Sequence, residues 1–319
     1  MRQLARLVTV ASAAALTVTA CGGSTNVLQG KSPQDIIKLA SASVGSGSYH
    51  MTMHGKVNID ASGIKGLPPD AVSSMTSVLK NVTIDGRGDV QSPQRMRMTM
   101  TMKPLIDKTL VVVFYDGKVY VSQDNGATFA DGGNLNLQGL PVSPQDMLTM
   151  LKDTGQLQDQ GATSRNGTQV EHLHAVINAD YLSKVLDTLS GSGNASGTSG
   201  ASAQILQQLG KIFQQTMTLS NSSVDAYVRQ SDGRMDSNDA TVNISIDMGK
   251  FFAAIVQILG SAGQIPSGSA GQIPNVTGTM AVNESVTATY SDYGAKITVA
   301  QPTVDPNAPA LPSGGLFGA

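Results

Sequence analysis

The chain has 319 residues, of which 40% are hydrophobic, 14% are charged and 4% are aromatic, with no tryptophan. This length suits one large domain or two small ones, and the low charge argues against a disordered acidic or basic tail protein. The formal net charge of -2 offers no basic face for a nucleic-acid partner. The single cysteine forms no internal disulfide, so the fold does not depend on cross-links.

Residues 1–20 follow the pattern of a secretory signal peptide. Arg2 and Arg6 are followed by an apolar run over residues 7–16 and then by small residues. The run is too short to cross a bilayer as a helix, which needs about 20 apolar residues. We therefore expect residues 1–20 to be removed and the mature chain to act outside the cytoplasm.

The motif Val18-Thr19-Ala20-Cys21 comes directly after the apolar run and resembles the lipobox of bacterial lipoprotein precursors. The resemblance implies that the Cys21 thiol takes a diacylglyceryl group and that cleavage falls before Cys21. The alternative is an ordinary signal peptide with an incidental cysteine. Because two acyl chains anchor a protein stably, we expect a lipid-anchored protein on the outer face of the cell membrane, with residues 21–31 as its tether.

The mature chain opens with a helix and then a strand. Ser32 is suited to cap a helix whose first position is Pro33, and the glycine- and serine-rich residues 45–48 end it. Over residues 49–60 apolar and polar side chains alternate, which predicts an antiparallel strand with one wet face.

The same reading extends along the rest of the chain. Further strands are predicted at residues 82–90, 95–103, 110–115, 118–122, 168–177, 222–229, 240–247, 280–290 and 296–300, and helical segments at 67–80, 143–152, 179–189, 204–217 and 248–259. Helices fall between groups of strands and not after every strand. This order favours an α+β fold with an antiparallel sheet, whose apolar face the helices cover.

Two segments interrupt the pattern and are predicted to be flexible insertions. Residues 190–202 are almost entirely small and polar, and residues 260–278 contain the sequence Ser-Ala-Gly-Gln-Ile-Pro twice. The proline- and glycine-rich residues 303–319 are expected to form a disordered tail. Residues 32–302 are therefore interpreted as a single domain.

A stripe of methionines marks one face of the predicted sheet. Soft, unbranched methionine side chains adapt to varied lipid tails, but methionine is also a common gap-filler in ordinary cores, and spacing does not separate these interpretations. The candidate lining residues of an apolar cavity are Met51, Met53, Val57, Met96, Met98, Met100, Met102, Val242 and Ile244.

The sequence predicts neither an enzyme nor a metal or cofactor site. His50 with His54, and His172 with His174, form pairs that could face one metal ion, but each lacks a third ligand of suitable spacing, so we interpret them as surface histidines. No phosphate-binding Gly-Lys-Ser/Thr loop and no Gly-x-Ser-x-Gly elbow is present.

Several segments in order resemble the mycobacterial LppX/LprG-type lipoproteins and the wider group related to LolA. The matching pieces are Ser48-Tyr49-His50-Met51-Thr52, Tyr115-Asp116-Gly117-Lys118-Val119-Tyr120-Val121-Ser122, residues 161–177 with Ala179-Asp180-Tyr181-Leu182, and Tyr290-Ser291-Asp292-Tyr293-Gly294-Ala295-Lys296-Ile297-Thr298-Val299. Together they span most of residues 32–302.

The resemblance implies a curved antiparallel half-barrel with helices covering its concave face. It also implies a carrier or chaperone that holds acyl chains of lipids or glycolipids in an apolar cavity, with a membrane transporter as a possible partner. The alternative is a surface lipoprotein that carries nothing and serves as an interaction or sensory module.

Overall fold

The computed structural model describes residues 26–44, 47–132, 144–154, 156–181, 208, 211–261, 275–306 and 308. The predicted signal peptide, Cys21, the insertion at 190–202 and most of the insertion at 260–278 lie outside the described residues. So does most of the predicted helix at 179–189. Of the predicted helix at 204–217, residues 208 and 211–216 are helical, and Met217 begins a strand. Within the described part of the chain, no helix is both long enough and apolar enough to cross a membrane.

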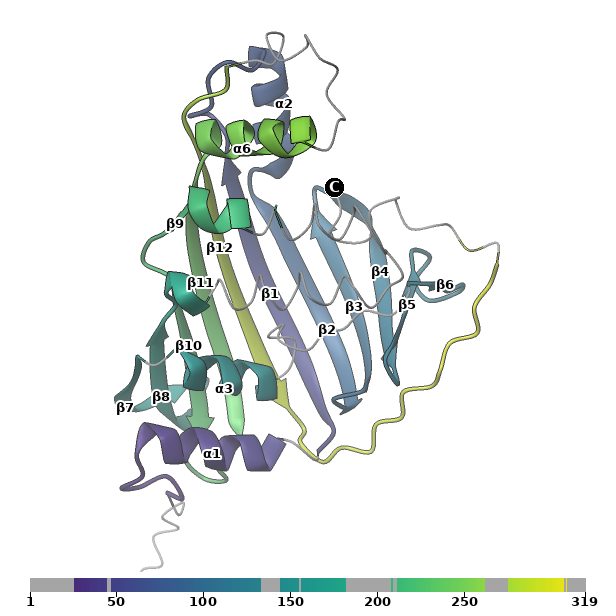
Figure 1. Cartoon of the computed structure of the whole chain (residues 1–319). Coiled ribbons are helices and arrows are strands. Elements are labelled where there is room, and N and C mark those ends of the chain that lie inside the picture. Colours follow the sequence, from purple (N-terminus) through teal and green to yellow (C-terminus); the bar gives the residue numbers. More distant parts are fainter. Residues whose placement is uncertain are drawn as a thin grey trace, which may run out of the picture.

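Over the described residues, twelve strands form one antiparallel sheet that does not close into a barrel (Figure 1). Their spatial order is β6-β5-β4-β3-β2-β1-β12-β11-β10-β8-β7, and β9 pairs with β11 beside this path. The strands are β1 (Tyr49–Asp60), β2 (Val82–Ser92), β3 (Arg95–Lys103), β4 (Ile106–Tyr115), β5 (Lys118–Ser122), β6 (Ala130–Asp131), β7 (Leu157–Arg165), β8 (Thr168–Val176), β9 (Met217–Leu219), β10 (Ser223–Arg229), β11 (Met235–Asp247) and β12 (Thr279–Ser291). The predicted fold class, a curved α+β sheet, is confirmed.

Within the described part of the chain, the helices lie on one face of the sheet, which we call the inner face, and gather at its two ends (Figure 1). Helices α1 (Pro33–Val44) and α3 (Pro144–Asp153) pack together at one end, and α2 (Pro69–Leu79) and α6 (Met248–Ser261) lie at the other. The start of α1 is as predicted. The Ser32 hydroxyl accepts a hydrogen bond from the Asp35 amide at 3.2 Å and donates to its carboxylate at 2.7 Å.

Two apolar clusters result from this arrangement. The first cluster joins α1 and α3 to the sheet, and its members include Ile36, Ala40, Leu148, Leu151, Leu173, Val224 and Tyr290. The second cluster lies at the α6 end and comprises Ala61, Ile64, Ile246, Met248 and Val276, with Phe213, Phe251 and Phe252 packed against it. Each helix pair therefore buries its own end of the inner face.

The C-terminal segment differs from its prediction. Residues 296–300, expected to be a strand, join no ladder; instead Ile297 and Val299 pack onto Val111 and Val113 on the other face of β4. The apolar and polar residues of this segment alternate because every second side chain points toward the sheet on which the segment packs. Further along the chain, Val304 forms a parallel bridge with Phe129.

Some strands of the sheet are longer than the sequence predicts, and others are not predicted at all. No strand was predicted at β7, whose residues are mostly polar and which lies at the edge of the sheet. Strands β4 and β11 each begin several residues earlier than predicted. Pairing with a neighbour extends these strands beyond the stretch of clear alternation.

We expect the packing of α3 to carry a large share of stability. Leu148 is fully buried in the first cluster, so Leu148→Ala should lower the free energy of unfolding by about 2–5 kcal/mol through lost transfer energy and a residual cavity. Leu105 is 42% exposed, and Leu105→Ala should change it by less than about 0.5 kcal/mol. Urea denaturation measures both; equal effects would contradict this packing.

Candidate functional site

The inner face of the central strands is apolar along almost its full length. The register places Met51 opposite Tyr290 and Gly88, and Met53 opposite Ala288 and Gly86. Because strand side chains alternate, the whole of this set points toward the helices. The strands thus offer a continuous apolar surface between the two clusters.

The nine predicted lining residues all fall on this face but differ in burial. Met51, Met96 and Met98 are buried members of the first cluster, where they act as core residues. Met53, Met100 and Val242 pack against that cluster, and Ile244 packs against the second. Val57 and Met102 are half-buried and belong to neither cluster. The two interpretations of the methionines therefore apply to different members of the stripe.

Between the two clusters lies a region that we call the central patch. Its members are half-buried, lie on the same face of the adjacent strands β3, β2, β1 and β12, and belong to no apolar cluster among the described residues: Val57, Ile59, Ile84, Met102, Val282 and Val286. A contiguous apolar surface that is left partly exposed is typical of an interaction site. The central patch is therefore the candidate functional site.

Glycines widen the space available to the methionines beside the central patch. A Cβ atom added at Gly86 would lie 3.3 Å from the Met53 methyl, and one at Gly88 would lie 3.3 Å from the Met51 methyl. Each methionine thus lies over a glycine of the next strand. Because a glycine has no side chain to hold the flexible methionine in place, the methionine can adjust its conformation to ligands of different shape.

One charged side chain, Glu284 of β12, lies within the central patch. Strand register places it between Val57 and Val242. Burial raises the pKa of the Glu284 carboxyl above its ordinary value, since an apolar environment disfavours the charged form. Glu284 is not among the residues predicted from the sequence to line a cavity, although the alternation of Met280, Val282, Glu284, Val286 and Ala288 places it on the apolar face.

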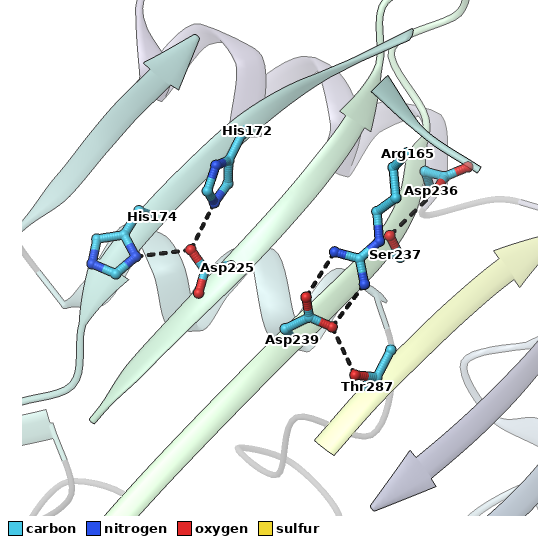
Figure 2. Close-up of polar contacts among 8 residues, drawn as sticks. All are labelled: Arg165, His172, His174, Asp225, Asp236, Ser237, Asp239 and Thr287. Atoms are coloured by element: carbon cyan, nitrogen blue, oxygen red, sulfur yellow. Dashed lines mark hydrogen bonds and ion pairs between the residues drawn. The ribbon is translucent and has the colours of Figure 1, made fainter. Parts of the chain in front are cut away.

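The four histidines lie on the opposite, polar face, each within hydrogen-bond distance of an aspartate. The Nδ1 atoms of His50 and His54 lie 2.7 Å and 2.6 Å from carboxylate oxygens of Asp89 and Asp85, respectively. Asp225 contacts both His172 and His174, at 2.7 Å and 2.8 Å (Figure 2). Within the described residues no group of three or more potential ligands could hold a metal ion.

The polar face also ties the β7 edge to strands further into the sheet. Arg165 of β7 makes two hydrogen bonds to Asp239 of β11, at 2.7 Å and 2.9 Å, and Asp239 accepts another from Thr287 (Figure 2). The Arg165 guanidinium also lies 4.0 Å from the centre of the Tyr227 ring. Burial alone would raise the pKa of the Asp239 carboxyl, but these hydrogen bonds hold it below its ordinary value.

Two grooves of about 670 Å³ and about 480 Å³ lie in the described structure. Most of their lining residues belong to the polar face, and the first groove is bordered by Thr52, His54, Asp85, Arg87, Thr99, Thr101, Thr109, Thr287 and Thr289. Of the predicted lining residues, Met53 and Met100 border the first groove, and Val57 borders the second together with Glu284. Threonine hydroxyls and charged side chains thus border the first groove, and asparagine side chains are prominent around the second.

Comparison with known proteins gives only structural likenesses; no family model and no curated protein matches the chain. Similar solved structures include LprF from Mycobacterium bovis (12% identity, TM-score 0.38, covering 85% of this chain and 96% of that one). The lipoprotein LppX of Mycobacterium tuberculosis has 11% identity and a TM-score of 0.33, covering 84% and 98%. A LolA-superfamily protein from Nitrosomonas europaea has 10% identity and a TM-score of 0.27, covering 84% and 95%.

These structures come from the groups to which the sequence was likened, so the resemblance drawn from the sequence and the comparison of structures agree. All three TM-scores are below 0.5. The fold class therefore rests on the strands and helices of this chain.

The position of Glu284 predicts a pH-dependent stability. Because its pKa is raised in the folded state, the ionised carboxyl destabilises the fold above that pKa, and the cost disappears as pH falls toward the unfolded-state value. Glu284→Gln should therefore raise the free energy of unfolding at neutral pH, and the gain should shrink as the solution is acidified. Urea denaturation across a pH series measures it.

The control for this prediction is Asp292→Asn, the same change of carboxyl to amide at an exposed position. It should alter stability little at any pH. If Glu284→Gln behaved in the same way, the carboxyl of Glu284 would have to lie in water.

Proposed function

We propose that the chain is a membrane-anchored extracytoplasmic lipoprotein that binds acyl chains of lipids or glycolipids on its inner face and carries them. The observation behind the proposal is the central patch, an apolar surface that is half-buried between two helix-covered clusters. No chemical step is part of this function, and we propose that the protein is not an enzyme.

The physical basis of binding is the removal of alkyl surface from water. Each buried CH₂ group contributes about 0.8 kcal/mol, so a chain that covers several of the half-buried side chains binds without any specific polar contact. The ligand also covers Val57, Met102 and their neighbours, whose exposure is unfavourable in its absence. Methionines at the border of the patch, Met53 and Met100, adjust to chains of different shape.

The composition of the polar face fits a protein that binds lipid on its inner face only. Paired histidines and aspartates and a band of threonines keep that side of the sheet hydrated. Ligand binding and contact with water are thus separated by the thickness of one sheet. A membrane transporter remains a proposed partner, to or from which the carrier would pass its lipid.

Adjacent residues of β3 give a matched test of which face binds lipid. Met100 points to the inner face, and Thr99 is exposed on the polar face. Met100→Glu should weaken binding of a fluorescent acyl probe with an uncharged headgroup at least about tenfold, because it places a charge beside the alkyl chain. Thr99→Glu should leave binding unchanged. Fluorescence titration measures both, with native mass spectrometry to detect co-purified lipid.

A milder variant, Met100→Gln, keeps the test valid if the charged variant fails to fold. Equal loss with Thr99→Glu would move the binding site to the polar face. A wild-type chain that carries no co-purified lipid and binds no probe would contradict the carrier function and favour the alternative, a surface lipoprotein that serves as an interaction module.

Anchoring depends on Cys21 and is tested separately. In cells fed labelled palmitate, the wild-type chain should become labelled and remain with the membrane fraction, because two acyl chains anchor stably. Cys21→Ser should abolish labelling and release the protein from the membrane. Labelling that persisted in Cys21→Ser would refute lipidation at this thiol.

A further inference from the structure

Glu284 lies in an apolar environment, which is unfavourable for an ionised carboxyl. Val57 and Val242 lie directly opposite it on the neighbouring strands, and Val282 and Val286 flank it on the same face of β12. It is the single charged side chain on the inner face of β1, β2, β3 and β12, counted over their described residues. The apolar surface therefore has one polar point near its centre.

Within the described part of the chain, Glu284 has no hydrogen-bond or ion-pair partner, and burial is the sole cause of its raised pKa. Lys56, next to Val57 in sequence, is exposed on the opposite face of β1. A carboxyl that is partly removed from water without a partner costs free energy. A ligand that supplies a hydrogen-bond donor at this point would recover that cost.

We propose that Glu284 is a specificity-determining residue of the lipid-binding face: its carboxyl accepts a hydrogen bond from a hydroxyl that the lipid carries beside its alkyl chain, and it disfavours an anionic headgroup. The inference rests on the proposed function and deepens it, because it names the chemistry of the preferred headgroup. An uncharged, hydroxyl-bearing lipid such as a monoacylglycerol has this chemistry.

Two physical effects produce the selectivity. A lipid without a donor leaves the buried carboxyl unpaired, and sites built around a hydrogen bond reject analogues that lack it. An anionic headgroup brings a second negative charge into surroundings of low dielectric constant, where like charges repel more strongly than in water. The four valines contribute alkyl contact to every ligand equally, so the headgroup alone decides the order of affinity.

The test compares three ligands with the same palmitoyl chain, in mildly alkaline buffer: monopalmitoylglycerol, methyl palmitate and palmitate. Monopalmitoylglycerol has hydroxyl donors, methyl palmitate has no donor, and palmitate carries a negative charge. The protein is the full chain carrying Cys21→Ser in every variant, and each ligand displaces a fluorescent, uncharged acyl probe. The wild-type background should bind monopalmitoylglycerol at least about tenfold more tightly than methyl palmitate, as one hydrogen bond to a charged group provides, and palmitate most weakly.

Two variants separate the two effects. Glu284→Leu should bind the glyceride and the methyl ester equally, because the acceptor is gone. Glu284→Gln keeps the shape and removes the charge, so its affinity for palmitate should rise toward that for methyl palmitate. Asp85→Asn, which removes a carboxylate on the polar face, is the matched control and should leave the wild-type order unchanged.

The outcomes distinguish this inference from the proposed function. If the wild-type background binds all three ligands equally and Glu284→Leu changes nothing, the specificity role is wrong and the carrier function stands. If Asp85→Asn alters the order as much as Glu284→Gln does, net charge decides selectivity and the role of Glu284 is again refuted. If no ligand and no probe binds, the proposed function itself fails.

Discussion

The pairing of β1 with β12 is the constraint on which the rest of the structure depends. It joins parts of the chain that are far apart: Thr52 and Thr289, whose hydroxyls meet across the pair, are 237 residues apart in sequence. Its register runs without interruption from His50 to Asp60. A slip of one residue would turn every side chain of β1 to the other face, which would bring histidines and lysine under the helices and methionines into water.

The alternation of apolar and polar side chains determined how much of the fold could be predicted from the sequence. Clear alternation gave β1 and β3 with their observed limits, and the Ser32 cap gave the start of α1. Residues 296–300 alternate just as well but only pack against the sheet, since alternation reports one buried face and carries no information on ladder hydrogen bonds. Strand β7 went undetected because it is a mostly polar edge strand with too few apolar side chains to show an alternation.

The candidate site was predictable in outline and not in detail. Periodicity placed the nine candidate residues on one face, but which of them are core and which are half-buried depends on where α1, α3 and α6 stop along the strands. That boundary is a tertiary property. For Glu284, the alternation of β12 was enough to place it on the apolar face. Its significance depends on the tertiary structure, which surrounds it with Val57, Val242, Val282 and Val286.

An open sheet has two free edges, and both are guarded against joining another chain. Strand β6 is only two residues long, and Val304 already bridges the adjoining Phe129. Strand β7 is polar, and its register with β8 shifts between Asp159 and Gly161, whose φ is +86°. Short, covered, polar and bulged edges are the devices by which proteins avoid edge-to-edge aggregation. The polar sequence that hid β7 from prediction therefore also makes this edge a poor template for pairing with another chain.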